Sequence, residues 1–329
     1  MPGALTSALP CSKTVDESHL TVLPVVLGPT GSGKSELALR VAGEFGGEIV
    51  NCDSVQIYRY FEIGTAKVPE SERRGIPHYL IDLVEPGELF TAGDYARSAR
   101  VVLGEIASRG HIPVLVGGTG FYLRALLEGL SPGPPRQDAL RAQLEDRERK
   151  RPGSLHRILT RLDPGAAARI HKNDVNKTLR ALEMRLVEGR PISELFAQGR
   201  GAPLQGFRPI KIGLSPHRDL LYRRIDLRTL AMFERGLVEE VRDLLARGVP
   251  AESKPFESLG YQQALEAVRG NITVEQAIQS TQLETRRYAK RQFTWFRRER
   301  DVRWLKGFGD EPDVIEQALG YIKSEIKKL

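Results

Sequence analysis

The segment with the clearest chemical pattern is GPTGSGKS, which follows the spacing G-x-x-x-x-G-K-S. The apolar run Thr21–Leu27 precedes it and the helix-forming stretch ELALRVAGEF follows it, the strand, loop and helix order that a phosphate-binding loop requires. Glycines in such a loop let successive backbone N–H groups converge on phosphate oxygens, and the helix N-terminus adds partial positive charge. The lysine neutralises a phosphate oxygen and the serine can ligate Mg²⁺. The sequence therefore predicts a phosphate site formed by Gly28, Pro29, Thr30, Gly31, Ser32, Gly33, Lys34 and Ser35.

Two acidic residues follow strand-like runs. Asp53 comes directly after Glu48–Cys52, and Asp82 lies near the end of His78–Leu83. In a parallel sheet the carboxyl ends of neighbouring strands gather beside the phosphate loop, so we expect Asp53 to face the site. It would act as a metal ligand or a general base, with capping of the next turn as the alternative. For Asp82 a structural role is favoured over an outer-shell contact with Mg²⁺.

Thr119 ends a third strand-like run. Ile112–Val116 is apolar, and the two glycines between it and Thr119 would allow a ligand to approach the backbone closely. We therefore include Thr119 among the candidate site residues.

The order of these segments predicts the fold. Strand-like runs alternate with helices such as Ala92–Ser108, which indicates an α/β fold with a P-loop NTPase-like parallel sheet flanked by helices. After a Pro- and Gly-rich linker, the pattern over residues 138–199 predicts helices throughout, and a strand returns at Phe207–Leu214. From Arg218 onwards the pattern again predicts only helices. We predict a flexible tail over 1–20, an α/β core over 21–135 and 203–329 with basic C-terminal helices, and an all-helical insertion domain over 136–202.

Composition limits the possible classes of protein. The chain has 329 residues, of which 40% are hydrophobic and 28% charged, as is typical of a globular protein. No run approaches the roughly 20 apolar residues of a membrane helix, and the first residues lack the features of a secretory signal. Cys11 and Cys52 form no C-x-x-C pattern. We therefore expect a cytoplasmic protein that makes no contact with membranes.

Positive charge is concentrated near the C-terminal end. The chain carries 49 Lys and Arg against 42 Asp and Glu, a net charge of +7, and residues 286–300 alone hold seven basic residues and one acidic residue. Tyr288, Gln292, Trp295 and Phe296 fall on one helical stripe within this segment and should pack on the core. The basic residues between them predict a surface for a nucleic-acid backbone, with a solvated helix face as the alternative.

In combination these segments resemble one family, the tRNA dimethylallyltransferases, also called tRNA isopentenyltransferases. The resemblance spans residues 24–298 in the family's order. No Cys or His pairs follow the basic helix, so the chain is similar to the bacterial members rather than to eukaryotic members with a C-terminal zinc finger. Besides the phosphate loop, the resemblance rests on DSVQIYR (53–59), IGTAK (63–67), VGGTGFYLRALLEGLSP (116–132), RIHKND (169–174), RALE (180–183), LYRRIDLR (221–228), GYQQ (260–263) and AKRQFTWFR (289–297).

The resemblance implies transfer of a dimethylallyl group from dimethylallyl diphosphate to N6 of adenosine 37, next to the anticodon, in tRNAs that read codons beginning with U. An exocyclic adenine amine is a poor nucleophile, so a base at Asp53 would remove its proton. Lys34, Mg²⁺ at Ser35, and Arg224 would stabilise the diphosphate that leaves. Thr119 would line the channel where the two substrates meet, and Gly28–Ser35 would bind the diphosphate.

The resemblance also implies that several segments contact tRNA. The helical insertion would close on the anticodon stem-loop with basic residues, although for Lys177 a solvated helix face is the alternative. The implied tRNA-binding residues are Asp53, Ser54, Val55, Gln56, Thr119, Arg141, Asn176, Lys177, Thr178, Leu179, Arg180, the segment 257–262 with Gly260, Tyr261 and Gln262, and Lys290, Arg291, Gln292, Phe293, Thr294, Trp295, Phe296 and Arg297.

Three positions depart from the family pattern. Gln262 stands where Lys or Arg is usual, and Lys172 and Val175 stand where proline is common. Two other enzymes remain as alternatives: an adenylate isopentenyltransferase, which would need neither the insertion nor the basic segment, and a P-loop small-molecule kinase, which would require ATP and an acceptor hydroxyl. A simple RNA-binding module would leave Lys34 and Asp53 without a task. The expected partners are tRNA and dimethylallyl diphosphate, with Mg²⁺ as cofactor, and the protein is expected to act as a monomer.

Overall fold

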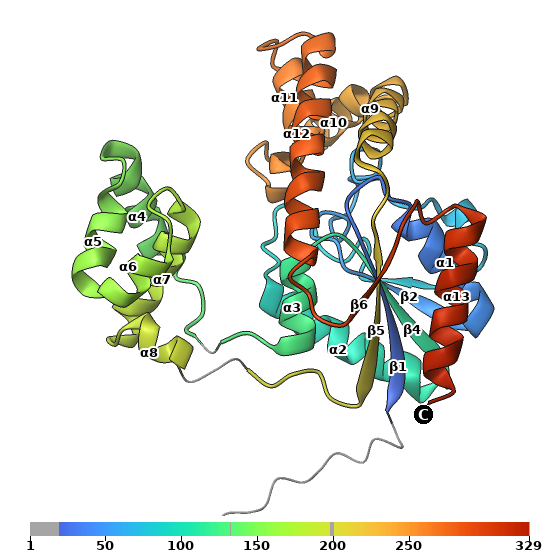
Figure 1. Ribbon diagram of the computed structural model, residues 1–329. Helices are drawn as coiled ribbons and strands as arrows, with labels where there is room; N and C mark the ends of the chain where they lie inside the picture. Colours follow the sequence, from blue (N-terminus) through green and yellow to red (C-terminus); the bar gives the residue numbers. More distant parts are fainter. Residues whose placement is uncertain (1–19, 132, 198–200, 329) are drawn as a thin grey trace, which may run out of the picture. The chain divides into compact units, whose positions relative to one another are not determined.

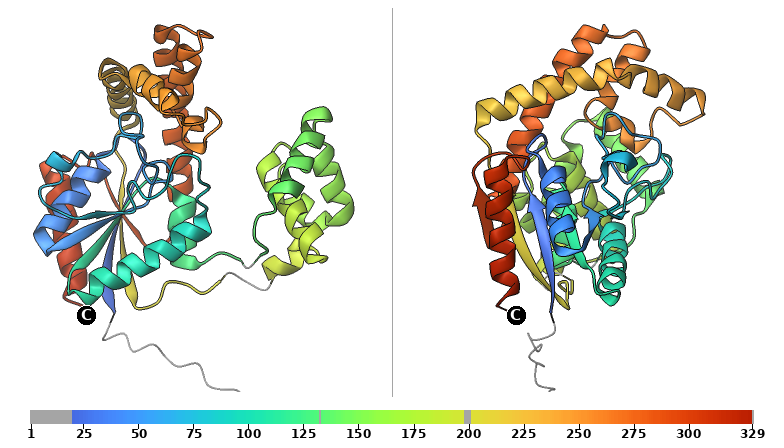
Figure 2. Two further views of the ribbon diagram at one scale, coloured as in Figure 1. Left: turned by 180° about the vertical axis from the view of Figure 1, so that it is seen from behind. Right: turned by 90° about the vertical axis from the view of Figure 1, so that its right-hand side faces the viewer.

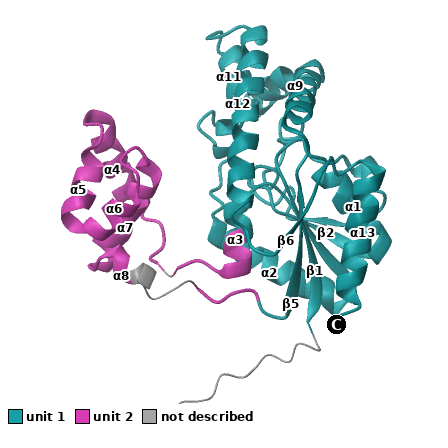
Figure 3. Cartoon of the chain, viewed as in Figure 1, with its two compact units in different colours: residues 1–123, 205–329 teal, residues 124–204 magenta. Residues whose placement is uncertain are grey.

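The structure, a computed structural model, describes residues 20–131, 133–197 and 201–328, so the predicted tail lies almost entirely outside it. It divides the chain into two compact units (Figure 3). Residues 1–123 and 205–329 form the first unit, and residues 124–204 form the second. In the described ranges, no helix is both long enough and apolar enough to cross a membrane.

A six-stranded parallel sheet forms the centre of the first unit (Figure 1). Its strand order is β3-β2-β4-β1-β5-β6, so the phosphate loop leaves the sheet from an interior strand. Six of the seven residues of β1 are buried, as the unbroken apolar run predicts for a strand covered on both faces. The predicted fold class is confirmed. The strands are β1 (Thr21–Leu27), β2 (Gly47–Asn51), β3 (His78–Tyr79), β4 (Ile112–Val116), β5 (Phe207–Leu214) and β6 (Val302–Leu305).

Helices cover both faces of the sheet. On one face α1 (Lys34–Phe45) and α13 (Pro312–Ile326) lie side by side and share one hydrophobic core with the strands (Figure 1). On the other face α2 (Ala92–Ser108) packs against β2 and β4. The short helix α3 (Gly120–Glu128) follows β4. Because these strands pair in parallel, the carboxyl ends of β1, β2 and β4, with their loops, lie at one edge of the sheet.

The C-terminal part differs from its prediction. Residues 302–305 form β6, which pairs in parallel with β5 and completes the sheet, although this region was expected to be helical throughout. β6 is only four residues long, too short for a strand to be recognised from its pattern, and it depends on β5 for hydrogen bonds. The strand predicted over His78–Leu83 is shorter than expected, because Leu80 and Asp82 have positive φ angles of 60° and 51°.

The helices between β5 and β6 lie mostly beyond the carboxyl ends of the strands (Figure 2). They pack on the loop after β2 through a second hydrophobic core that contains Ile57, Phe61 and Tyr261. The longest of them, the helix Val274–Phe296, runs back past the ends of β1 and β4. These helices are α9 (Arg218–Glu234), α10 (Leu237–Ala246), α11 (Tyr261–Val268) and α12 (Val274–Phe296), and the 3-10 turns are η2 (Glu70–Glu72) and η3 (Lys254–Glu257).

The second unit contains only helices among its described residues. Its own core is built from apolar side chains such as Leu159, Leu182 and Ile192. Asp163 and Asp174 each accept a backbone hydrogen bond at the start of a helix, which explains where two of these helices begin. The helices are α4 (Asp138–Lys150), α5 (Ser154–Leu162), α6 (Pro164–Arg169), α7 (Val175–Glu188) and α8 (Ile192–Ala197).

Candidate active site

The phosphate loop joins the end of β1 to the start of α1. Gly33 has a φ angle of 84°, and a Cβ atom there would lie 2.8 Å from the backbone nitrogen of Gly309, so glycine is required for both reasons. The Lys34 ammonium donates a hydrogen bond to the carbonyl of Pro29 at 2.7 Å, which folds its side chain back over the loop. The loop and its lysine therefore line a cavity, which we call the phosphate cradle.

Gln292 of α12 connects the phosphate loop to the end of β4. The Thr30 N–H donates to its amide oxygen at 2.8 Å, and its amide nitrogen donates to the carbonyl of Gly118 at 2.9 Å. The side chain of Gln292 is buried. A Cβ atom at Gly118 would lie 2.3 Å from the Gln292 amide nitrogen. The missing side chain at Gly118 therefore makes room for Gln292 rather than for a ligand.

The segment after β6 closes over the other side of the loop. The Gly309 N–H donates to the carbonyl of Ser32 at 2.9 Å. The next residue, Asp310, forms an ion pair with Arg224 of α9, with nitrogen–oxygen distances of 2.7 and 3.0 Å. One turn further along α9, Arg228 lies 3.3 Å from the Thr30 hydroxyl. Arg228 therefore contacts the loop directly, while Arg224 is held beside it by Asp310, and of the two only Arg224 was predicted.

Asp53 lies at the end of β2. One oxygen of its carboxylate accepts the N–H of Val55 at 2.9 Å, so the turn after the strand holds its orientation. Thr119 joins this turn to β4, because its hydroxyl accepts the N–H of Ser54 at 3.0 Å. Asp82 instead forms an ion pair with Lys67 at 2.5 Å, which supports the structural role favoured for it.

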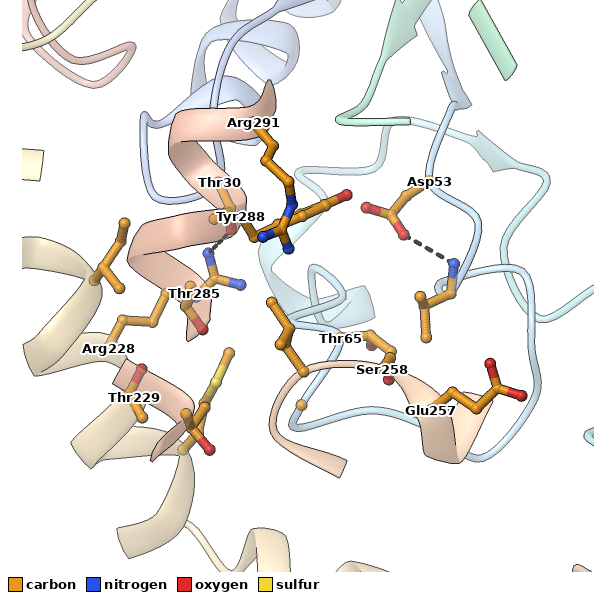
Figure 4. Close-up of a pocket in the computed structure, with 16 residues that line it drawn as sticks. Thr30, Asp53, Thr65, Arg228, Thr229, Glu257, Ser258, Thr285, Tyr288 and Arg291 are labelled. Atoms are coloured by element: carbon orange, nitrogen blue, oxygen red, sulfur yellow. Dashed lines mark hydrogen bonds between the residues drawn. The ribbon is translucent and has the colours of Figure 1, made fainter. Parts of the chain in front are cut away.

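Two adjoining cavities share Asp53, Thr30 and Arg228 in their walls. One, of about 280 Å³, is lined by the phosphate loop, Arg224 and the glycines after β4. The other, of about 340 Å³, has a mixed lining, in which apolar side chains such as Ile225 and Met232 lie beside threonines and charged groups of α9 and α12 (Figure 4). In the figure Tyr288 and Arg291 extend from α12 toward Asp53. Asp53 thus lines both the smaller cavity, which is the phosphate cradle, and the larger cavity, which we call the chamber.

The positive charges around the cradle favour binding of an anion. Burial and the nearby Arg228 lower the pKa of Lys34 to about 7, and Asp53 offsets part of this shift. Burial also lowers the pKa of Arg228. Two buried cations held close together, with Asp53 offsetting only part of their repulsion, raise the free energy of the empty site, and a bound diphosphate would relieve that repulsion.

Oxygen donors suited to Mg²⁺ line the same cavity. Ser35 and Asp53, which carry a hydroxyl and a carboxylate, both line this cavity. Mg²⁺ commonly binds through one or two protein oxygens and completes its shell with substrate phosphates and water, so this small donor set fits the ion. Among the described residues, no cluster of three or more His, Cys, Asp and Glu side chains forms a dedicated metal cage.

The predicted tRNA-binding residues of α12 fall on two faces of the helix. Lys290, Arg291, Thr294 and Arg297 are exposed. Gln292 and Phe296 are buried, as the predicted stripe required, with Tyr288 half-buried. The buried side chains therefore anchor the helix, while the exposed basic residues form a surface that a polyanion can reach.

The predicted tRNA-binding residues of the second unit divide in the same way. Asn176 and Lys177 are exposed, whereas the side chains of Thr178 and Leu179 lie in the helical core. The fully buried carboxylate of Glu183 accepts hydrogen bonds from both predicted arginines. Its partners are Arg180 at 2.7 Å and Arg141 at 3.4 Å. Thr178 and Leu179 thus support this surface from within.

The segment 257–262 borders the larger cavity with Glu257 and Ser258. Gln262 is exposed, but the Tyr261 side chain is fully buried. Its hydroxyl contacts the loop at Gly64 rather than the surface. Tyr261 therefore offers no side-chain surface to RNA.

Comparison with known proteins places this arrangement in a family. The model of the IPP transferase family matches residues 56–299, most of the chain. The chain belongs to the IPP transferase family. A tRNA dimethylallyltransferase from Solibacter usitatus is 60% identical over 297 residues, covering 90% of this chain and 96% of the relative. One from Koribacter versatilis is 55% identical over 304 residues, covering 92% and 98%.

Solved structures of IPP transferases show the same architecture. A full-length tRNA isopentenylpyrophosphate transferase from Bacillus halodurans has a TM-score of 0.69 and 35% identity, covering 94% of this chain and 97% of its own. A eukaryotic dimethylallyltransferase, solved acting on tRNA, has a TM-score of 0.79 and 27% identity, covering 94% and 80%. The recognition of the family from its motifs is thereby confirmed.

Some residues of this site were not predicted as such. Arg228 repeats Arg224 at the i+4 position of α9, a spacing that puts both on one helix face and could have identified it. Tyr288 was assigned to packing, yet it also lines the larger cavity. Asp310 carries no signal in the sequence, since only the unpredicted strand β6 brings it to the phosphate loop.

Proposed function

We propose that this protein transfers a dimethylallyl group from dimethylallyl diphosphate to N6 of adenosine 37 in tRNA and releases diphosphate. The observation that carries the proposal is Asp53, which lies in the walls of both the phosphate cradle and the adjoining chamber. A transferase needs such a residue where the two substrates meet. Membership of the IPP transferase family and relatives named tRNA dimethylallyltransferase support the same reaction.

The cradle would hold the diphosphate and stabilise it as it leaves. When the allylic C–O bond breaks, its electron pair stays with the former ester oxygen, so negative charge develops on the oxygens of the departing diphosphate. Lys34, Arg224 and Arg228, together with the N–H groups of the loop, would stabilise that charge. Bound Mg²⁺, held through Ser35 and the phosphates, would supply further positive charge there.

Asp53 would act as the general base. The adenine N6 lone pair is delocalised into the ring, so proton removal must accompany formation of the C–N bond. The carboxylate is held by the Val55 N–H through one oxygen, which leaves the other for the amine. The dimethylallyl group loses its bond to the phosphate oxygen, gains one to N6, and the N6 proton passes to Asp53.

The adenosine would enter the chamber as a base turned out of its stack, which costs a few kcal/mol. The exposed basic face of α12, with Lys290, Arg291 and Arg297, would bind the RNA backbone. In the second unit, Arg141 and Arg180 would contact the anticodon stem-loop. We further propose that the enzyme works in the cytoplasm, as a monomer.

A label-transfer assay tests this function. The protein is incubated with labelled dimethylallyl diphosphate, Mg²⁺ and tRNA, beside tRNA lacking adenosine 37, free AMP, and ATP as a donor control. Label on intact tRNA alone is the expected result. Label on AMP would indicate an adenylate isopentenyltransferase, and ATP consumption without transfer would indicate a kinase or ATPase.

A matched variant connects the assay to the site. Asp53→Asn keeps the side-chain oxygen that accepts the Val55 N–H but removes the base, so turnover should fall about 10² to 10⁴-fold while tRNA still binds. Wild-type turnover in this variant would remove Asp53 from the role of base.

A further inference from the structure

The loop that contains residues 62–65 forms a wall of the reaction site. Gly64 and Thr65 line the larger cavity, and Thr65 also lines the phosphate cradle. The carbonyl of Thr65 accepts a hydrogen bond from the amide of Gln56 at 3.0 Å, and the Gln56 N–H lies 3.4 Å from the Asp53 carboxylate. The position of this loop therefore affects both the cradle and the turn that carries the proposed base.

Two side chains from distant helices hold this loop. Glu240 of α10 accepts the N–H groups of Glu62 at 3.2 Å and Ile63 at 2.9 Å, one on each carboxylate oxygen. The hydroxyl of Tyr261, at the start of α11, accepts the N–H of Gly64 at 3.1 Å and donates to Glu240. Three successive backbone donors of the loop are thus satisfied by one pair of side chains.

The packing leaves the loop little alternative. The Tyr261 ring lies so close that a Cβ atom at Gly64 would be 2.5 Å from it. The same ring packs edge-on against Phe61, with ring centroids 4.8 Å apart. Loop, tyrosine and carboxylate therefore form one hydrogen-bonded unit around the buried ring of Tyr261.

We propose that Glu240 and Tyr261 are positioning residues that fix residues 62–65 as the wall of the reaction site, so that dimethylallyl diphosphate meets a preformed cavity. The inference rests on the proposed function, and it assigns Tyr261 an internal task in place of contact with tRNA. Neither residue lines either cavity, so both would act through the loop. A cavity held in the productive shape lowers the ordering that substrate binding must bring about.

Steady-state kinetics of Tyr261→Phe and Glu240→Gln test the proposal. Tyr261→Phe keeps the ring and removes the hydroxyl, while Glu240→Gln keeps the shape and replaces one acceptor oxygen with an amide nitrogen. We expect KM for dimethylallyl diphosphate to rise about fivefold to tenfold in each variant, with the Kd for tRNA unchanged within about twofold. The double variant should show little further change, because both single variants free the same loop.

Matched controls separate positioning from general damage. Tyr79→Phe removes a hydroxyl that accepts from Arg109, and Glu239→Gln changes the exposed neighbour of Glu240. Both should leave KM unchanged. A role confined to stability would lower the amount of folded enzyme and the rate, but not KM, which does not depend on enzyme concentration. If Tyr261→Phe fails to fold, Glu240→Gln decides alone.

The outcomes distinguish this inference from the proposed function. If the wild-type protein transfers label to tRNA and both variants keep its KM, the positioning role is wrong. A weaker Kd for tRNA with unchanged KM would also overturn it, because Tyr261 would then serve RNA binding. Failure of the wild-type protein to transfer label would instead overturn the proposed function.

Discussion

Arg224 and Asp310 lie 86 positions apart in the sequence, yet they form a bidentate ion pair beside the phosphate loop. The guanidinium group also lies over the ring of Phe308, 4.8 Å from its centroid. Both charged side chains are about 40% exposed, so the pair contributes little to stability, on the order of 1 kcal/mol or less. The ion pair matters instead because it orients the Arg224 side chain at the phosphate cradle.

Removal of Asp310 should therefore affect substrate binding more than stability. We expect Asp310→Asn to raise KM for dimethylallyl diphosphate about threefold to tenfold, since Arg224 loses the partner that orients it, and to leave the urea midpoint nearly unchanged. Asp219→Asn, at an exposed position near the start of the same helix as Arg224, is the control. A KM equal to that of the wild-type protein would show that the diphosphate orients Arg224 without help.

Binding of inorganic diphosphate should depend on the protonation of Lys34. With a pKa of about 7 in the free protein, the lysine is partly neutral at pH 7, and a bound anion raises that pKa. Binding then takes up a proton, so the lysine's contribution to affinity grows as pH falls from 8 to 6. Calorimetry in buffers of different ionisation enthalpy measures this uptake.

The variant Lys34→Arg is the control for that experiment, because arginine stays charged across the whole range. Its pH dependence reports only the titration of the diphosphate itself. Equal proton uptake by the wild-type protein and this variant would mean that Lys34 is already charged in the empty site.

The buried amide of Gln292 should stabilise the junction of two loops. Gln292→Leu would leave the Thr30 N–H and the Gly118 carbonyl without their partner, and the free energy of unfolding should fall by about 2 to 4 kcal/mol. Urea unfolding measures the change, with the exposed Gln262→Leu as the control. A loss of tRNA affinity with full stability would return Gln292 to the tRNA-binding role first predicted for it.

The exposed basic residues of α12 should bind tRNA through its phosphates. Alanine at Lys290, Arg291 or Arg297 should weaken binding and lower the slope of log K against log salt by about one for each phosphate that the protein no longer neutralises. Arg40→Ala removes an exposed arginine from α1 and should change neither value. Affinity unchanged at all three positions would indicate that this face is only solvated.

The sequence predicted those parts of the site that lie within single segments. The phosphate loop, Asp53 and Thr119 each follow directly on a strand, so local pattern and sheet geometry place them together. Arg224 was identified by its motif rather than by its surroundings.

The parts that could not be predicted are contacts between distant segments. β6 is too short to be recognised without β5, and without β6 nothing indicates that Asp310 reaches the loop. The same holds for Gln292, Tyr261 and Glu240. Each is an ordinary polar residue on a helix until tertiary packing gives it buried partners.

The contacts that distant residues make with the phosphate loop have a consequence for synthesis of the protein. Gln292 is 262 positions downstream of Thr30, and Gly309 and Asp310 come later still. Nearly the whole chain therefore has to emerge from the ribosome before the loop gains its partners, even though β1 and α1 emerge first. The growing chain lacks a finished site until these late residues have been made and have left the ribosome.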